Sequence, residues 1–358
     1  MTDAPLPPEP PDPTPAKPKR RPRYSGKNPR KFHEKYKELN PERYATDVEK
    51  ILASGKTPAG SHRSIMVDEI LEALAPKPGD IAVDGTLGYG GHARAILERI
   101  APGGRLIGLD VDPMELPKTE ARLREAGIGA ESFLAVRSNF AGLPKVLAQY
   151  SIEGVDIILA DLGVSSMQLD NPERGFTFKE SGPLDMRMNP ARGEPASKFI
   201  EHISEARLAQ LLEENSDEPH ARVLASAMKR SGEPIRTTGA LAQLLRNALR
   251  GATIKSDEAE LAVRRVFQAL RIAVNDEFSA LDTFLRHLPQ CLKPGGRAAI
   301  LTFHSGEDRR VKKAFQAGER EGIYSEVARD VIRASPDEIR ANSRASSAKL
   351  RWVVRSST

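Results

Sequence analysis

Ile81-Ala-Val-Asp-Gly-Thr-Leu-Gly-Tyr-Gly-Gly-His92 is the stretch of this 358-residue sequence that decides the fold. A short apolar run ends in Asp84 and opens directly into a glycine-rich turn. Glycine permits positive φ angles and close backbone approach to a ligand, and residues 93–100 have the apolar spacing of a helix packed on a sheet. The stretch therefore predicts a strand, a cofactor loop and the start of a helix.

A second apolar run, Arg105-Leu-Ile-Gly-Leu-Asp110, ends in its own acid about two dozen residues after Asp84. This is the spacing at which an acid meets a ribose in Rossmann-like nucleotide sites. A nicotinamide dinucleotide needs helix N-terminal amides for its pyrophosphate, whereas S-adenosylmethionine brings a sulfonium and an ammonium that favour carboxylates. Because Asp84 precedes the glycines, the loop favours S-adenosylmethionine. A glycine-rich turn without a ligand is the alternative.

The length of 358 residues suits one large or two medium domains, and a hydrophobic fraction of 39% is enough for the sizeable core of a globular protein. No run of eighteen apolar residues occurs, and the N-terminus is proline-rich and then basic, so we expect neither a membrane span nor a secretory signal, and a cytoplasmic location. Cys291 is the only cysteine and the seven histidines are scattered, so we expect no disulfide and no metal. Monomer and homodimer both remain open.

A basic arm stands out in the charge distribution. Residues 17–37 hold ten Lys or Arg against the single acid Glu34, while the whole chain carries a net charge of +5. Tyr24, Phe32 and Tyr36 alternate with these cations, a mixture that neutralises phosphates and stacks on exposed bases. The arm therefore points to nucleic acid, with a solvated disordered tail as the alternative.

Strand and helix patterns alternate along the rest of the chain, which predicts an open, mostly parallel, doubly wound α/β sheet with helices on both faces. The expected strands are 81–84, 105–110, 133–136, 155–161, 297–302 and 349–354, and a long helix is expected over 264–292. The alternation breaks after Asp161, where helical patterns at 204–214, 219–229 and 238–249 predict an inserted bundle. We expect a disordered basic extension over 1–60, a cofactor domain over 61–170 and 262–358, and a helical, substrate-binding insert over 171–261.

Ligands of open α/β sheets lie beyond the carboxyl ends of the strands, so the residues that follow these strands should converge. They are Asp84, Asp110, Phe140 and Asp161. Asp110 would accept the ribose hydroxyls and Phe140 would pack beside the adenine. Gly90, Gly91 and His92 would approach the amino-acid part of the cofactor, although His92 alternatively only starts the helix.

Two loops follow the fourth strand. Asp161-Leu-Gly-Val-Ser-Ser-Met-Gln-Leu-Asp170 lies where amino-methylating enzymes hold the target amine, and Arg174-Gly-Phe-Thr-Phe178 carries an arginine and aromatic residues. Gly182-Pro-Leu-Asp-Met-Arg-Met188 is a further loop with an arginine, and both it and the Arg174–Phe178 loop, with arginines and aromatic residues at exposed-looking positions, suit a flipped or single-stranded base. Alternatively, Phe176 and Phe178 anchor their loop in a core.

The ordered motifs of the chain resemble those of the bacterial 16S ribosomal RNA cytosine-N4 methyltransferase family over residues 62–316. The motifs are Asp161-Leu-Gly-Val-Ser-Ser with Gln168-Leu-Asp170, Glu173-Arg-Gly-Phe, Gly182-Pro-Leu-Asp-Met-Arg-Met188, Phe267-Gln-Ala-Leu-Arg-Ile-Ala-Val-Asn-Asp-Glu277, and Phe303-His-Ser with Glu307-Asp-Arg309. The resemblance implies a class I methyltransferase fold with a helical insert, S-adenosylmethionine as cofactor, and the decoding-site cytosine of 16S ribosomal RNA in the small subunit as substrate. It places cofactor binding on Gly90, Gly91, His92, Asp110, Phe140, Asp161 and Gln168.

The chain also departs from the family pattern. The segment Asn215-Ser-Asp-Glu-Pro lacks the family's glycine, Phe303-His-Ser-Gly-Glu has glycine where the family has leucine, and the basic arm is not a usual family feature. The same chemistry on another RNA cytosine, and an inactive RNA-binding paralogue, are therefore alternatives. A nicotinamide-dependent oxidoreductase leaves the insert and the arm unexplained, and a DNA cytosine methyltransferase would need Pro-Pro-Tyr after Asp161.

The chemistry implied by the resemblance requires a group that orients the amine. Cytosine N4 is a poor nucleophile because its lone pair is delocalised into the ring, so positioning should supply most of the rate. We expect Asp161 or its carbonyl, with Ser165 or Ser166, to accept N4 hydrogen bonds, and Asp161 or water to take the proton. His304 and Glu307 are further candidates for base positioning, with a structural turn as the alternative.

Overall fold

The computed structural model describes residues 64–252 and 254–357, with the side chain of Ser166 excepted. These residues belong to a compact unit that runs from Ser61 to Thr358. The basic arm predicted over residues 17–37, and the extension predicted over 1–60, lie outside the described residues.

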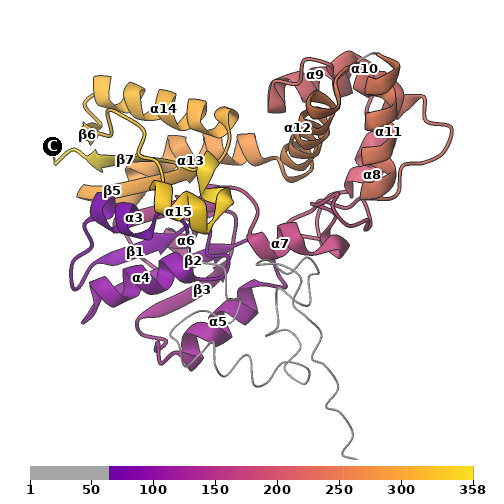
Figure 1. Ribbon diagram of the computed structural model, residues 1–358. Helices are drawn as coiled ribbons and strands as arrows, with labels where there is room; N and C mark the ends of the chain where they lie inside the picture. The colour runs from indigo at the N-terminus through magenta and orange to yellow at the C-terminus, as the bar shows by residue number, and fades with distance from the viewer. Residues whose placement is uncertain (1–63, 253, 358) are drawn as a thin grey trace, which may run out of the picture. The chain divides into compact units, whose positions relative to one another are not determined.

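A seven-stranded sheet forms the base of the described unit, in the order β3-β2-β1-β4-β5-β7-β6 (Figure 1). The strands are β1 (Ile81–Asp84), β2 (Arg105–Asp110), β3 (Phe133–Arg137), β4 (Val155–Asp161), β5 (Leu292–Thr302), β6 (Tyr324–Val327) and β7 (Lys349–Arg355). The strands from β3 to β5 pair in parallel, and β7 is antiparallel to both β5 and β6. The predicted fold class, a mostly parallel doubly wound α/β sheet, is confirmed.

The strand order places the carboxyl ends of β1, β2 and β4 side by side. β1 lies between β2 and β4, and its last residue, Asp84, is in register with Gly108 on one side and Leu159 on the other. Asp110 and Asp161 each end a neighbouring strand two positions further on. Because the strands are parallel, the three acids lie at one edge of the sheet.

Helices cover both faces of the sheet, because the strands are apolar on both sides. On one face, α3 (Val67–Leu74), α4 (Gly91–Ile100) and α5 (Leu116–Glu125) share a core with Ala82 and Leu106. On the other, α6 (Leu143–Gln149), α13 (Glu277–Cys291) and α14 (Ser305–Arg320) share a core with Val83 and Ile107. Adjacent strand residues thus point to opposite cores, as the pleat requires.

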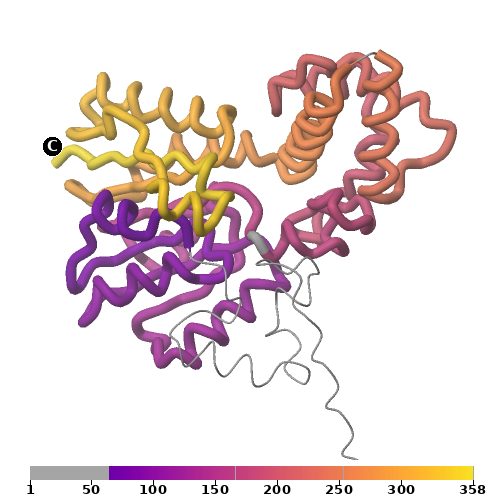
Figure 2. Tube along the Cα trace, in the orientation of Figure 1, coloured from indigo at the N-terminus to yellow at the C-terminus, as the bar shows by residue number. Residues whose placement is uncertain are grey.

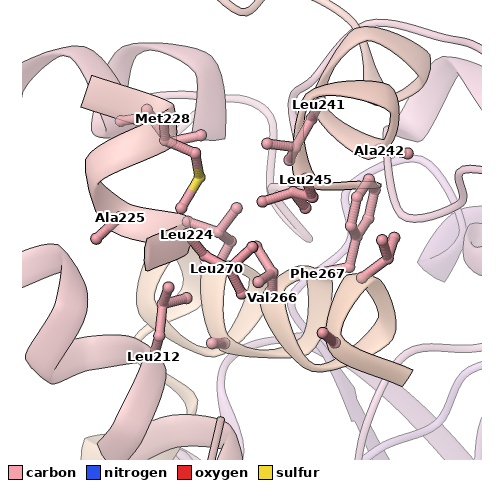
Figure 3. Packing of buried hydrophobic residues seen from close by; sticks show 14 of the residues in the cluster. Leu212, Leu224, Ala225, Met228, Leu241, Ala242, Leu245, Val266, Phe267 and Leu270 are labelled. Atoms are coloured by element: carbon pink, nitrogen blue, oxygen red, sulfur yellow. The ribbon is translucent and has the colours of Figure 1, made fainter. Parts of the chain in front are cut away.

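The chain leaves the sheet after β4, builds a cluster of helices, and returns through α12 and α13 (Figure 2). The cluster contains α8 (Ala196–His202), α9 (Glu205–Ser216), α10 (Ala221–Lys229), α11 (Thr238–Gly251) and α12 (Ser256–Asn275). Its core draws side chains from α9, α10 and α11 onto α12, among them Leu212, Leu224, Leu245 and Leu270 (Figure 3). The helical patterns at 204–214, 219–229 and 238–249 correspond to α9, α10 and α11.

The single helix predicted over residues 264–292 was wrong, because two helices occupy this stretch. α12 ends at Asn275, and α13 starts at Glu277. Asp276 between them has a φ of 52°, a left-handed conformation that ends a helix and that Asp tolerates better than most residues. The apolar spacing continues through the break, so periodicity alone could not locate it.

Two further strand predictions needed correction. β5 begins at Leu292 rather than at residue 297, because Leu292 pairs with Val155. β6 was not predicted, since it has only four residues and exposes two of them. A short strand at a sheet edge carries too little apolar patterning to be recognised.

The two phenylalanines of the Arg174–Phe178 loop pack inside the helical core. Phe176 is 6% exposed, and Phe178 lies edge-on to Phe267 with 4.9 Å between ring centroids. The alternative in which both residues anchor their loop is therefore the correct one. The same loop leaves its arginine, Arg174, to make the polar contacts described below.

Two features are absent from residues 64–252 and 254–357. No helix there is long and apolar enough to cross a membrane. The same stretch holds no group of three or more His, Cys, Asp or Glu side chains that could hold a metal ion.

The helical core offers a direct stability test. Leu270 of α12 is fully buried, whereas Leu261 of the same helix is 43% exposed. We expect Leu270→Ala to lower the free energy of unfolding by about 2–5 kcal/mol, because it removes buried methyl groups and leaves a cavity. Leu261→Ala, the matched control, should change it by less than about 0.5 kcal/mol. Urea unfolding of the two variants checks this, and equal losses would contradict the packing.

Candidate active site

The loop between β1 and α4 needs its glycines for backbone shape and for packing. Gly88 and Gly90 have φ angles of 50° and 84°, which favour glycine. A Cβ on Gly90 would lie 2.9 Å from Cγ2 of Thr119, and one on Gly91 would lie 2.0 Å from Oγ of Ser64. A side chain at Gly90 or Gly91, the two glycines expected to approach the cofactor, would therefore require Thr119 or Ser64 to move.

Three carboxylates gather at the carboxyl ends of β1, β2 and β4. Burial raises the pKa of Asp84 and the pKa of Asp110 to about 6 each. Burial, with the nearby charge of Glu307, raises the pKa of Asp161 to about 7. A cation placed among them would favour their ionised forms. The arrangement suits a ligand that carries positive charge.

The three carboxylates differ in what they can touch. Asp84 is only 1% exposed and accepts the amide of Thr86 at 3.0 Å, so it acts on a ligand through its charge rather than by contact. Asp110 accepts the amide of Gly88 at 2.9 Å and that of Asp112 at 2.8 Å, which fixes its orientation. Asp161 keeps 27% of its side chain exposed. Asp110 and Asp161 are thus the better placed for direct contact.

His92 lies beside Asp161 and is held by a backbone carbonyl. Its Nε2 is 2.9 Å from the oxygen of Ile65, and because a carbonyl only accepts, Nε2 carries the hydrogen. Its Nδ1 is 3.6 Å from Oδ2 of Asp161. Burial lowers the pKa of His92, so the ring is neutral and turns a lone pair toward Asp161. His92 is also the second residue of α4, so starting the helix and contacting the site go together.

Phe140 follows β3 in the short helix η2 (Phe140–Gly142). Its ring and that of Phe284 form a T-shaped pair, with 5.3 Å between centroids. Asn139 caps the turn by accepting the amide of Ala141 at 2.8 Å. The ring is half-buried beside the β1 loop, since a Cβ on Gly85 would lie 3.2 Å from Cβ of Phe140.

The loop after β4 begins helix α7 (Ser166–Asp170) with a capping box. The Ser165 hydroxyl oxygen accepts the amide of Gln168 at 3.2 Å, and Oε1 of Gln168 accepts the amide of Ser165 at 3.0 Å. Nε2 of Gln168 donates to Oδ2 of Asp112 at 2.7 Å. Both ends of the Gln168 amide therefore bond to protein. Ser166 starts α7, and its side chain lies outside the described part of the structure.

His304 and Glu307 form a second polar group near Asp161, at the start of α14. Nε2 of His304 is 3.1 Å from Oε1 of Glu307, and Oε2 of Glu307 accepts the amide of Phe303 at 2.9 Å. These contacts, with the charge of Arg271, hold the pKa of Glu307 below its usual range despite burial. Glu307 is thus a fixed negative charge whose carboxylate also holds the turn before α14, which is consistent with both sequence interpretations.

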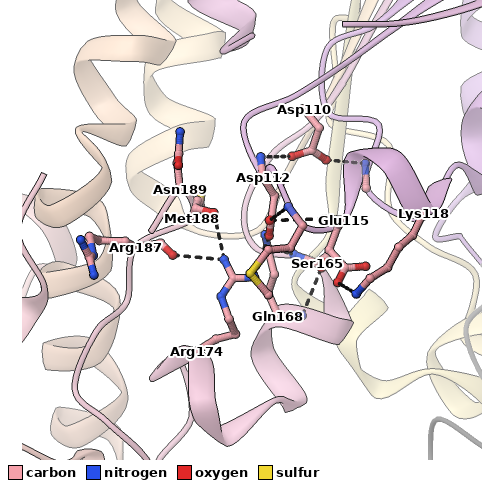
Figure 4. Close-up of polar contacts among 12 residues, drawn as sticks. Asp110, Asp112, Glu115, Lys118, Ser165, Gln168, Arg174, Arg187, Met188 and Asn189 are labelled. Carbon is pink, nitrogen blue, oxygen red and sulfur yellow. Dashed lines mark hydrogen bonds and ion pairs between the residues drawn. The ribbon is translucent and has the colours of Figure 1, made fainter. Parts of the chain in front are cut away.

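Asp112 was not predicted, and the prediction of an exposed Arg174 suited to a base was wrong, because Arg174 is 6% exposed and pairs with Asp112. Nη1 of Arg174 donates to Oδ2 of Asp112 at 2.7 Å, and both side chains are nearly fully buried (Figure 4). Asp112 follows Asp110 by two positions, but no pattern in the sequence links it to a residue 62 positions further on. The position of Arg174 in a recurring motif was the available signal.

The fold and this edge of the sheet define the class of protein. The strand order, with β7 antiparallel between β5 and β6, is that of class I methyltransferases. The glycine loop and the carboxylates at the strand ends match a cationic cofactor. The protein is therefore an enzyme of the class that takes its methyl group from S-adenosylmethionine.

Comparison with known proteins identifies the family. A sequence model of the MraW methylase family matches residues 59–356, so the chain belongs to that family. It is 51% identical over 342 residues to ribosomal RNA small subunit methyltransferase H 1 of Agathobacter rectalis, covering 94% of this chain and 97% of that protein. It is 48% identical over 341 residues to ribosomal RNA small subunit methyltransferase H 2 of Alkaliphilus metalliredigens, with 94% and 97% covered.

A third relative shows how the family differs in the N-terminal arm. Ribosomal RNA small subunit methyltransferase H of Syntrophotalea carbinolica is 43% identical over 311 residues, covering 82% of this chain and 98% of that protein. The first two relatives cover 94% of this chain, a share that residues 61–358 cannot supply alone. The alignment with them therefore extends into the arm, and the arm distinguishes this chain from only part of its family.

The raised pKa of Asp84 predicts how stability depends on pH when no cofactor is bound. The folded state holds the Asp84 proton up to about pH 6, whereas the unfolded state releases it near pH 4. The stability that Asp84 contributes is therefore complete at acid pH and is lost as the pH rises through 6. Between pH 5 and 8, the wild type should lose about 1–2 kcal/mol of unfolding free energy relative to Asp84→Asn.

Urea unfolding at the two pH values checks this difference. The control is Asp337→Asn, whose carboxylate is 87% exposed, and it should track the wild type at both pH values. A difference between wild type and Asp84→Asn that does not change with pH would contradict the assignment.

Proposed function

We propose that this chain transfers the methyl group of S-adenosylmethionine to the exocyclic N4 of a cytosine in 16S ribosomal RNA. The observation that carries the proposal is the match over 94% of the chain to relatives named ribosomal RNA small subunit methyltransferase H, together with the acids at the ends of β1, β2 and β4. The cytosine N4 target comes from the motifs after β4. A small-subunit RNA substrate implies a cytoplasmic location.

The cofactor would lie across the ends of the three central strands. Asp110 would accept its ribose hydroxyls, and the half-buried ring of Phe140 would pack beside the adenine. Asp84 would stabilise the sulfonium and the ammonium by its buried charge. Gly90, Gly91 and His92 would form the wall beside the amino-acid part.

Asp161 and Ser165 would hold the target amine. Asp161 is partly exposed at the end of β4, and its backbone amide donates to Oγ1 of Thr86 at 2.6 Å, which fixes the strand end. The Ser165 oxygen uses one lone pair on the Gln168 amide and retains the other. Hydrogen bonds from N4 to these oxygens would localise the amine lone pair and direct it at the methyl carbon.

The proton released from N4 can be accepted at Asp161. The methylated nitrogen is strongly acidic, so no strong base is required. Asp161 has its pKa near 7 without cofactor, and the arriving cation lowers it, so Asp161 becomes an ionised acceptor when the donor is bound. The neutral His92 lies beside this carboxyl group, with its Nδ1 3.6 Å from Oδ2 of Asp161.

Mapping N4-methylcytosine in ribosomal RNA by mass spectrometry, with and without the gene, tests the proposed substrate. We expect loss of the mark at the decoding-site cytosine, with restoration by the gene on a plasmid. An unchanged mark there, with a loss elsewhere, would favour a different RNA cytosine. An unchanged methylation map, combined with RNA binding by the pure protein, would favour an inactive RNA-binding paralogue.

Asp161→Asn tests the proposed role of the carboxylate. We expect the single-turnover rate to fall on the order of 100-fold, because an amide neither accepts the N4 proton nor carries charge. Asp156→Asn is the matched control, since Asp156 lies on the same strand but accepts the amide of Ile81 and pairs with Lys293. It should keep the wild-type rate. If Asp161→Asn turned over normally with normal cofactor binding, Asp161 would not act on the amine.

A further inference from the structure

One buried carboxylate connects the three loops that surround the candidate site. We name Asp112, Gln168 and Arg174 the Asp112 cluster. Oδ2 of Asp112 accepts Nε2 of Gln168 and Nη1 of Arg174, both at 2.7 Å, and Oδ1 accepts the amide of Met114 at 2.9 Å. Asp112 has no exposed surface, and Gln168 and Arg174 are 7% and 6% exposed. Asp112 therefore acts through its neighbours.

The first two links of the cluster lead to residues proposed to hold cofactor and substrate. The backbone amide of Asp112 donates to Oδ1 of Asp110 at 2.8 Å. Asp110, which is proposed to bind the ribose, therefore lies in the same turn as Asp112. Through Gln168, the cluster reaches the capping box of Ser165 at the start of α7. The two loops after β2 and β4 are thereby fixed against each other.

The third link leads into the helical cluster. Nη2 of Arg174 donates to the carbonyl oxygens of Arg187 at 3.2 Å and of Met188 at 2.9 Å (Figure 4). The amide of Met188 in turn donates to Oδ1 of Asn275 at 2.7 Å, and Asn275 is the last residue of α12. One guanidinium therefore bridges the cofactor side and the segment that leads to the helices.

The geometry of Arg174 explains why an arginine is needed. Its planar fork places one nitrogen on a carboxylate and another on two carbonyls, which a lysine ammonium on a single stem cannot do at these distances. Both charges are buried, so each depends on the other, and removal of either leaves an uncompensated charge. This accounts for two motifs, Glu173-Arg-Gly-Phe and Gly182–Met188, that the proposed chemistry leaves without a role.

We propose that Asp112 is a positioning residue, which through Gln168 and Arg174 holds the amine-binding loop and the segment 182–188 in register with the cofactor. The expected effect of Asp112 on the methyl-transfer rate rests on the proposed function. Its expected effect on the rigidity of segment 182–188 rests on the structure alone. Asp112 supports transfer without touching cofactor or RNA.

Asp112→Asn and Arg174→Lys test the proposal, with Asp156→Asn as the control carboxylate that pairs with a lysine away from the site. In Asp112→Asn the backbone amide that fixes Asp110 remains. We therefore expect the Kd for S-adenosylmethionine to stay within about threefold of wild type while kcat on small subunits falls at least tenfold. Arg174→Lys should likewise lower kcat while leaving the Kd nearly unchanged. The kcat of the double variant should be no lower than that of the more impaired single variant.

Hydrogen–deuterium exchange of the protein without cofactor or RNA gives a readout that needs no activity. Backbone amides of residues 182–190 should exchange at least tenfold faster in both variants and at the wild-type rate in Asp156→Asn. If Asp112→Asn does not fold, Arg174→Lys keeps both charges and carries the test.

Three results would overturn the proposal. The first is unchanged exchange in 182–190. The second is a loss of kcat matched by an equal loss of cofactor affinity, which would make Asp112 a support for the cofactor alone. The third is additive losses in the double variant. A wild-type enzyme that fails to methylate small subunits would instead contradict the proposed function, and the exchange result would still decide the order of the segment.

Discussion

The structure depends on the concentration of negative charge at one edge of a parallel sheet. Parallel strands bring their carboxyl ends together, so Asp84, Asp110 and Asp161 lie where burial opposes their ionisation and raises the pKa of each. The protein thereby loses stability near neutral pH when the site lacks a cation. A sulfonium and an ammonium restore this stability on binding, because they stabilise the ionised carboxylates. The site is therefore selective for a cationic cofactor rather than a pyrophosphate.

Asp112 differs from these three acids because it is buried beside a cationic partner, Arg174. Arg174 forms a buried ion pair with it, and the proposed role of this pair is to position the loops rather than to bind a ligand. The two kinds of carboxylate lie two residues apart, at Asp110 and Asp112, and a backbone hydrogen bond joins them. A cofactor site and the segment 182–188 can thus be kept in register although β3, β4 and the helices between them separate the two along the chain.

Much of this architecture could be predicted from the sequence. Each apolar run that ends in an acid predicts a strand, and the acid marks the carboxyl end of that strand, where ligands bind. Asp84, Asp110 and Asp161 were placed in this way, and the position of Phe140 after β3 followed. The break at Asp276 and the Asp112–Arg174 pair could not be predicted, because the first leaves the apolar spacing intact and the second joins residues 62 positions apart. Local periodicity carries no information on such pairing.

The central claim is that cofactor binding ionises carboxylates that are partly protonated in the free enzyme. Titration calorimetry with S-adenosylmethionine at pH 6.5, in buffers of different ionisation enthalpy, counts the protons exchanged on binding. We predict net proton release, with less for S-adenosylhomocysteine, whose neutral thioether lacks the sulfonium charge. Proton uptake, or equal counts for the two ligands, would contradict it.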